Sequence, residues 1–106
     1  MTENNVKVIL ATCTIAYSRR VMCPCEDLVS QCIIDESAMC IEAETLCGML
    51  GSKPEQVVLI GDHKQLQPII KCKQAKQLGL GVSMFERYSK KANMLKLQYR
   101  MVSFFG

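Results

Sequence analysis

Two short apolar runs, each ending abruptly in acidic residues, constrain the fold more than any other feature of this sequence. Residues 32–34 precede Asp35 and Glu36, and residues 57–60 precede Gly61 and Asp62. Apolar runs of this length between turn signals are typical of strands buried on both faces of a parallel sheet. In open α/β sheets, ligands bind beyond the carboxyl ends of the strands. The two runs therefore predict a site at one edge of a sheet, with Asp35 and Glu36 as its acidic pair.

The rest of the pattern predicts strands that alternate with helices. We expect strands at 6–11, 28–34, 55–60 and 94–97, helices at 37–50, 69–78 and 83–92, and a polar loop at 61–68. Ser37 is the expected cap of the first helix, and Gly51 is its expected end. Such alternation is typical of crossover units and a parallel sheet, so the predicted fold class is α/β.

Composition excludes several classes of protein. The 106 residues are 49% apolar and 22% charged, which argues for one folded domain and against disorder. No apolar run reaches the eighteen or so residues that span a bilayer. The start of the chain has no basic segment followed by an apolar one, so we expect an intracellular protein, cytoplasmic or nuclear.

The seven cysteines do not predict a disulfide framework. Their number is odd, and several lie in apolar runs, where a thiol behaves as a small hydrophobe. Zinc is the other alternative, but Cys23 and Cys25 form a single close pair and His63 is the only histidine. We expect reduced, mostly buried cysteines.

Charge is distributed unevenly along the chain. Residues 1–50 carry three basic and seven acidic side chains, a balance of −4, whereas residues 51–106 carry ten and three, a balance of +7. A basic second half can face a polyanion such as nucleic acid or nucleotide phosphate. A solvated, lysine-rich surface explains the same balance equally well.

A buried strand that ends in Asp-Glu suits nucleotide hydrolysis. Asp35 can hold Mg²⁺ through water, since magnesium keeps much of its hydration shell. Glu36 can accept a proton from the attacking water or orient that water. The same pair at the end of a strand is more often a helix cap followed by a solvated acid.

Two further segments carry groups suited to a phosphate. In the loop 61–68, Gln65 can donate to a phosphate oxygen and accept from water, although an ordinary polar loop also fits and His63 is best explained as structural. Near the end of the chain, Tyr99 can stack on a base and Arg100 can bind phosphate. The alternative places Tyr99 in the core and Arg100 in a salt bridge.

Taken together, the order and spacing of these segments resemble a known family. Ile-Ile-Asp-Glu-Ser at 33–37, Val-Leu-Ile-Gly-Asp-His-Lys-Gln-Leu-Gln-Pro at 58–68 and Leu-Gln-Tyr-Arg-Met at 97–101 resemble motifs II, III and IV of superfamily 1 helicases. The most similar subgroup is the up-frameshift helicases of nonsense-mediated decay with their zinc-finger-helicase relatives. Residues 11–14 resemble motif Ic and residues 83–87 the Ser-Leu-Phe-Glu-Arg helix of this subgroup, so the resemblance covers residues 6–101.

The resemblance implies ATP and Mg²⁺ as cofactors and assigns a role to each residue around them. Asp35 would coordinate Mg²⁺ and Glu36 would handle the hydrolytic water. Gln65 and Arg100 would contact the γ-phosphate, and Tyr99 would stack near the adenine.

The resemblance also implies single-stranded RNA or DNA as a partner, with RNA favoured by the subgroup. Thr12 and Pro68 would lie along that strand, on the opposite side of the working edge from ATP. Because the loop 61–68 carries both Gln65 and Pro68, a shift on hydrolysis can reach phosphate and nucleic acid together.

Several positions depart from the family pattern. Ala43 stands where proline is frequent, Gln67 replaces a small residue or proline, and residues 102–106 lack the usual His-Pro continuation. The sequence also contains no Gly-x-x-x-x-Gly-Lys-Ser/Thr, the loop that wraps nucleotide phosphates.

By this resemblance, residues 1–106 are an incomplete RecA-like P-loop NTPase domain, the latter half of the first of two such domains. The phosphate-loop strand, which belongs between the strands at 55–60 and 94–97, and the second RecA-like domain are expected outside the chain. The absent strand would leave two unpaired edges, so we expect a marginal fold without ATPase activity of its own.

Two other functions fit parts of the pattern. A truncated, catalytically inactive module that binds nucleic acid or a protein partner would keep the fold without the activity. A two-carboxylate hydrolase unrelated to nucleotides would leave Gln65, Tyr99 and Arg100 unexplained.

Overall fold

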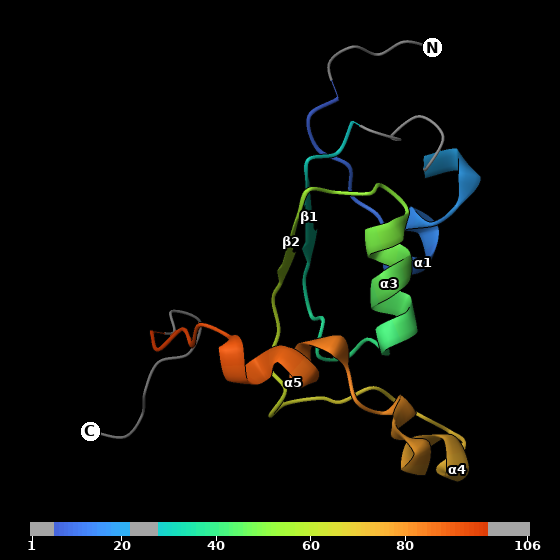
Figure 1. Ribbon diagram of the computed structural model, residues 1–106, viewed down its shortest axis with the longest axis vertical. Coiled ribbons are helices and arrows are strands. Elements are labelled where there is room, and N and C mark those ends of the chain that lie inside the picture. The colour runs from blue at the N-terminus through green and yellow to red at the C-terminus, as the bar shows by residue number, and fades with distance from the viewer. Residues whose placement is uncertain (1–5, 22–27, 98–106) are drawn as a thin grey trace, which may run out of the picture.

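The computed structural model describes residues 6–21 and 28–97, which form an α/β arrangement around a two-stranded parallel sheet (Figure 1). The elements in chain order are α1 (Cys13–Ala16), β1 (Gln31–Ile34), α3 (Glu42–Leu50), β2 (Gln56–Leu59), α4 (Lys73–Ala75), the π-helical turn η1 (Lys76–Leu80), α5 (Met84–Tyr88) and the 3-10 helix η2 (Ser89–Lys91). No helix among these residues is long and apolar enough to cross a membrane.

The parallel pair predicted from the two apolar runs is confirmed. In β1 and β2, Gln31 lies opposite Gln56 and Ile34 lies opposite Leu59. The backbone N–H of Ile60 donates to the Ile34 carbonyl at 2.9 Å, which continues the ladder one residue past β2. Both strands run in the same direction, so the segments that follow them leave the sheet at the same end (Figure 1).

Only one face of this sheet is covered. Cys32 and Ile34 face α3, where the Cys32 thiol donates to the Gly48 carbonyl at 3.8 Å. On the other face, Ile33 is 63% exposed and its partner Val58 is 47% exposed. The expectation of strands buried on both faces is therefore wrong for the described residues.

The strands expected at 6–11 and 94–97 are also wrong, since the described residues there form no strand. Leu10 is 92% exposed and Leu95 is 86% exposed. A strand needs a neighbour for its N–H and C=O groups, and neither segment pairs with β1 or β2 in the described sheet. Their apolar pattern favours an extended backbone, but a strand also requires a neighbouring strand to pair with.

The helices differ from expectation mainly where they begin. The first crossover helix, α3, begins at Glu42 rather than after Ser37, because Ser37 bonds to Ile60 instead of capping a helix. The next helical stretch runs from Lys73 through η1 and ends near Gly79, whose φ of 96° is left-handed. The helix α5 begins at Met84, next to the expected start at 83, and the Ser83 hydroxyl caps it by accepting from the Glu86 N–H at 3.1 Å.

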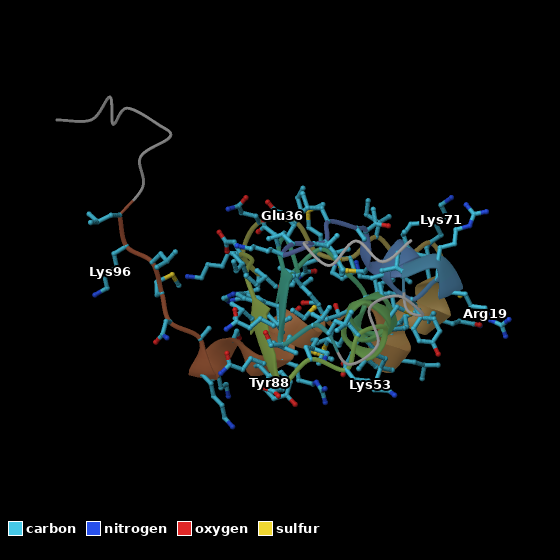
Figure 2. The ribbon with its side chains drawn as sticks, turned by 90° about the horizontal axis from the view of Figure 1, so that it is seen from above. Arg19, Glu36, Lys53, Lys71, Tyr88 and Lys96 are labelled. Carbon is cyan, nitrogen blue, oxygen red and sulfur yellow. The ribbon has the colours of Figure 1, made fainter. Side chains whose placement is uncertain are left out.

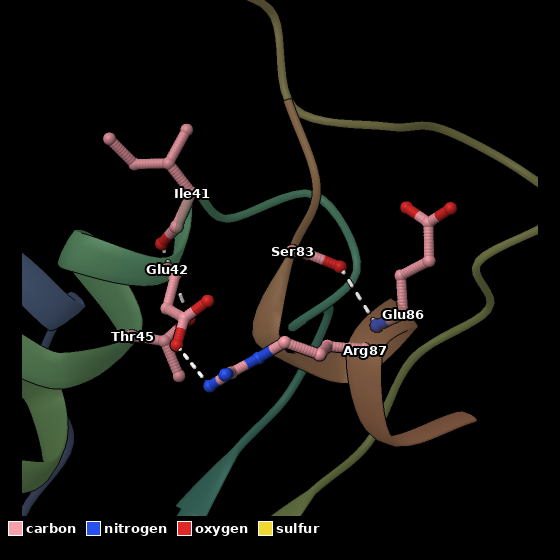
Figure 3. A network of polar contacts seen from close by, with 6 residues as sticks. All are labelled: Ile41, Glu42, Thr45, Ser83, Glu86 and Arg87. Carbon is pink, nitrogen blue, oxygen red and sulfur yellow. Dashed lines mark hydrogen bonds and ion pairs between the residues drawn. The ribbon is translucent and has the colours of Figure 1, made fainter. Parts of the chain in front are cut away.

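An ion pair joins α5 to the start of α3, which is distant from it in the sequence (Figure 3). The Arg87 guanidinium pairs with the Glu42 carboxylate at the start of α3. At the same helix start, the Ile41 N–H donates to the Glu44 carboxylate at 3.2 Å. Apolar burial is sparse by comparison: among the described residues, Ile34, Ala38, Pro68 and Met84 are the buried apolar side chains.

The close packing of α1 on α3 predicts a steric effect at Gly51. A Cβ at this position would lie 2.5 Å from the Ala16 carbonyl oxygen, which is backbone and cannot rotate away. We expect Gly51→Ala to lower the free energy of unfolding by about 1–3 kcal/mol through overpacking. Urea unfolding followed by circular dichroism measures this change.

Gly81→Ala is the matched control, because its added Cβ would meet only side-chain atoms at 3.5 Å or more. We expect a change within about 0.5 kcal/mol. Equal effects of the two substitutions would contradict the packing of α1 against α3.

Candidate functional site

The acidic pair follows β1 directly and forms a tight turn. The Asp35 carboxylate accepts from the Glu36 N–H at 2.9 Å. Glu36 has a φ of 52°, a left-handed conformation that is uncommon for a residue with a side chain and is found preferentially at functional turns. Both side chains are exposed, and Figure 2 places Glu36 at the outer margin of the molecule. The predicted acidic residues are thus presented to solvent at the carboxyl end of a strand.

The next residue, Ser37, ties this turn to the chain that leaves β2. Its backbone N–H and its hydroxyl both donate to the Ile60 carbonyl oxygen, each at 2.8 Å. Ser37 is fully buried. Sequence reasoning missed this contact, since a serine ahead of a helical pattern reads first as a cap.

The loop after β2 is organised by Asp62. One Asp62 carboxylate oxygen accepts from the Lys64 N–H at 2.9 Å, and the other accepts from the Gln65 side-chain amide at 2.8 Å. These two bonds hold the pKa of Asp62 below its ordinary value; the bond from the Lys64 N–H has the larger effect and the bond from the Gln65 amide the next largest. A loop Asp that bonds to the backbone two residues on is a known turn signal, so this contact could have been anticipated.

The structure therefore brings part of the predicted site to one edge. Asp35 and Glu36 leave β1, and the loop with Gln65 leaves β2, at the same end of the sheet. Tyr99 and Arg100 lie outside the described residues. Convergence of all five side chains on one triphosphate stays a prediction.

The residues predicted to contact nucleic acid differ in exposure. Thr12 is exposed and caps α1, where its hydroxyl accepts from the Ile15 N–H at 3.3 Å. Pro68, at the end of the loop, is buried. Their predicted contacts with a nucleic-acid strand stay predictions.

A cavity of about 600 Å³ lies beside β1, between the segment 9–14, α1 and α3. Thr12 and Asp35 both line it, together with mostly apolar side chains. Two of the lining residues, Cys32 and Cys40, have a raised thiol pKa. Burial is the larger cause, and the neighbouring Cys13 is the second.

The cysteines are less buried than expected. The five that the structure describes are free thiols; four are partly exposed and Cys72 is exposed. The expectation of mostly buried cysteines is therefore wrong, and Cys23 and Cys25 lie outside the described residues.

The residues at the sheet edge fit a magnesium ion shared with a phosphate ligand. Within residues 6–21 and 28–97, no group of three or more His, Cys, Asp or Glu side chains can hold a metal by itself. Mg²⁺ on a nucleotide needs only one or two carboxylates, with phosphate and water as its other ligands. An exposed Asp35 at the end of β1 meets that requirement.

Comparison with known proteins gives a consistent set of similarities. A family model described as an AAA domain matches residues 1–73. The chain is 46% identical over 96 residues to the 3'-5' exoribonuclease HELZ2 of Mus musculus, covering 89% of this chain and 3% of that protein. It is 49% identical over 75 residues to the regulator of nonsense transcripts 1 homolog of Arabidopsis thaliana, covering 67% of this chain and 6% of that protein.

A third relative extends the similarity to a protein named for helicase activity. The chain is 36% identical over 102 residues to the ATP-dependent helicase NAM7 of Saccharomyces cerevisiae, covering 92% of this chain and 10% of that protein. No solved structure matches the chain. The chain thus spans a tenth or less of the length of these three relatives.

The two hydrogen bonds to Asp62 predict its titration. Its lowered pKa means that they stabilise the folded loop at neutral pH, and that this contribution is lost as pH falls through the lowered pKa. We expect Gln65→Ala to raise the pKa of Asp62 toward the ordinary value without reaching it, because the Lys64 N–H remains. Carboxyl NMR titration measures the shift.

Gln67→Ala, in the same exposed loop, is the control and should leave the Asp62 titration unchanged. An unaltered Asp62 pKa in Gln65→Ala would show that the amide does not hold the carboxylate in solution.

Proposed function

We propose that this chain, which belongs to the AAA-domain family and to the up-frameshift-like helicases of superfamily 1, is the latter half of the first RecA-like domain of an ATP-dependent helicase. In this function, ATP hydrolysis is coupled to movement along a nucleic-acid strand. The observation that carries the proposal is the common edge at which the acidic turn and the Gln65 loop leave parallel strands.

The described residues would act on ATP and Mg²⁺ in separate roles. Asp35 would hold the metal through water, and Mg²⁺ when bound would neutralise phosphate charge. Glu36 would orient the attacking water and accept its proton. The left-handed φ of Glu36 supports this division, since it gives Glu36 a backbone conformation different from that of Asp35.

Gln65 would sense the γ-phosphate. In the structure one N–H of its amide donates to Asp62, and the second N–H of the same amide would donate to phosphate. Arg100 would contact the same phosphate and Tyr99 would stack near the adenine. The phosphate-loop strand and the second RecA-like domain would complete the cleft.

Single-stranded RNA is the proposed nucleic-acid partner, with DNA as the alternative, and the proposed location is cytoplasmic or nuclear. The relatives named as regulators of nonsense transcripts support RNA. Thr12 and Pro68 would lie along the strand, and the basic second half of the chain suits a polyanion.

The alternative is an inactive module that binds nucleic acid or a protein partner. One observation favours it: the described residues bury few apolar side chains.

Glu36→Gln in the complete protein that carries this segment separates the two functions. The change keeps size and removes the base, so we expect ATP hydrolysis to fall by about 10²–10⁴-fold while ATP affinity is retained. Steady-state hydrolysis and nucleotide-binding titration measure the two quantities.

Glu55→Gln is the control, since Glu55 is exposed just before β2, at the opposite end of the sheet, and should leave hydrolysis unchanged. Full hydrolysis in Glu36→Gln would exclude the assigned role, and a wild-type protein without ATPase activity would favour the binding module.

The 106-residue chain by itself is expected to turn over no ATP above background. Positioning supplies most of the catalysis in phosphoryl transfer, and this sequence contains no loop to wrap the phosphates. A phosphate-release assay on the purified chain, with the complete protein as positive control, tests this; turnover by the isolated chain would contradict the domain assignment.

A further inference from the structure

We propose that Ser37 is a positioning residue, which fixes the acidic turn against the loop that carries Gln65 so that the two halves of the site move as one unit. The inference rests on the proposed function. Ser37 touches neither phosphate nor water in this role; it acts through Glu36 on one side and through Ile60 on the other.

The first support is the hydrogen bonding of the Ile60 peptide. Its N–H donates to Ile34 at 2.9 Å, and its carbonyl oxygen accepts both the N–H and the hydroxyl of Ser37 at 2.8 Å. A carbonyl oxygen has two lone pairs, and Ser37 occupies both. The Ile60 peptide is therefore held by β1 on one side and by the turn after β1 on the other.

The second support is the absence of space at this junction. A Cβ on Gly61 would lie 2.9 Å from the Ala38 nitrogen and 3.3 Å from the Ser37 nitrogen. Ser37 is 0% exposed and Ala38 is 2% exposed. The two segments thus approach each other backbone to backbone, which leaves little room for one to shift without the other.

The third support is the backbone of Glu36. Its left-handed φ of 52° persists because the residues on both sides are fixed: Asp35 accepts the Glu36 N–H, and Ser37 is bonded to Ile60. Release of Ser37 would free the turn to relax, and Glu36 would move with it. On the other side, Ile60 lies two residues before Asp62, which holds Gln65.

Ser37→Ala in the complete protein tests the proposal. The substitution keeps the backbone N–H bond to Ile60 and removes the hydroxyl bond, so the turn keeps its backbone conformation but becomes more mobile. We expect kcat for ATP hydrolysis to fall about tenfold or more, as catalysis is sensitive to misplacement of about 1 Å. ATP affinity should stay within about twofold, because Ser37 contributes no ligand contact.

Ser83→Ala is the matched control. Ser83 is also a buried serine, at 1% exposed, but its hydroxyl accepts a local bond, from the Glu86 N–H three residues on, instead of joining two distant segments. It caps α5 and lies outside the junction, so its loss should lower thermal stability without lowering kcat. Gly61→Ala is the second test variant, since it opens the same junction from the β2 side and should reproduce the loss of kcat at unchanged ATP affinity.

The outcomes separate this inference from the proposed function. Loss of hydrolysis in Glu36→Gln together with a selective fall of kcat in Ser37→Ala and Gly61→Ala supports both. Loss in Glu36→Gln with wild-type kcat in Ser37→Ala, or with equal kcat in Ser37→Ala and Ser83→Ala, overturns the positioning role alone. Failure of Ser37→Ala to fold at the assay temperature, where Ser83→Ala folds, also overturns it by assigning the hydroxyl to stability.

Discussion

The carbonyl oxygen of Ile60, which accepts two hydrogen bonds from Ser37, is the point on which the arrangement of the sheet edge depends. Two parallel strands fix their own spacing only as far as their ladder extends, and this ladder ends at Ile60. Beyond it, the segments after β1 and β2 would diverge without a further contact. A fully buried serine supplies that contact, and Gly61 permits the close approach that it requires.

This reliance on short polar contacts follows from how little apolar surface the described residues bury. The buried apolar side chains among these residues are Ile34, Ala38, Pro68 and Met84, and one face of the sheet is exposed. The contact of α3 with α5 depends on Arg87 and Glu42, a partly exposed pair that contributes about 0–1 kcal/mol, and the Ser83 cap contributes about 1 kcal/mol. Such contacts orient elements well but stabilise them weakly.

The sequence predicted the features that depend on local chemistry. Apolar runs located β1 and β2, and the pattern from residue 83 onward located the start of α5, because these signals lie within the segments themselves. The prediction failed where the structure of a segment depends on a distant partner. Residues 6–11 and 94–97 carry strand patterns but have no neighbouring strand in the described structure. Ser37 carries a cap signal, but its backbone N–H and hydroxyl donate to Ile60. For the site, the expectation that Asp35, Glu36 and the Gln65 loop leave two parallel strands at the same end is confirmed. Spacing does not specify the bond between Asp62 and Gln65, which competes with other donors, or the long-range bond between Ser37 and Ile60.

In the proposed function, the contact between Asp62 and Gln65 has an electrostatic consequence for the resting site. The Gln65 amide is held by a carboxylate whose pKa is lowered, so the carboxylate stays charged at neutral pH and remains a strong acceptor. A γ-phosphate at the sheet edge would be a second anion close to the Gln65 amide, which has a second N–H to donate. Because like charges repel, phosphate close to this loop would disfavour Asp62 at its present position while attracting the amide. Phosphate binding would then draw Gln65 and its loop toward the sheet edge, and in the proposed role of Ser37 the junction would carry this displacement to Glu36.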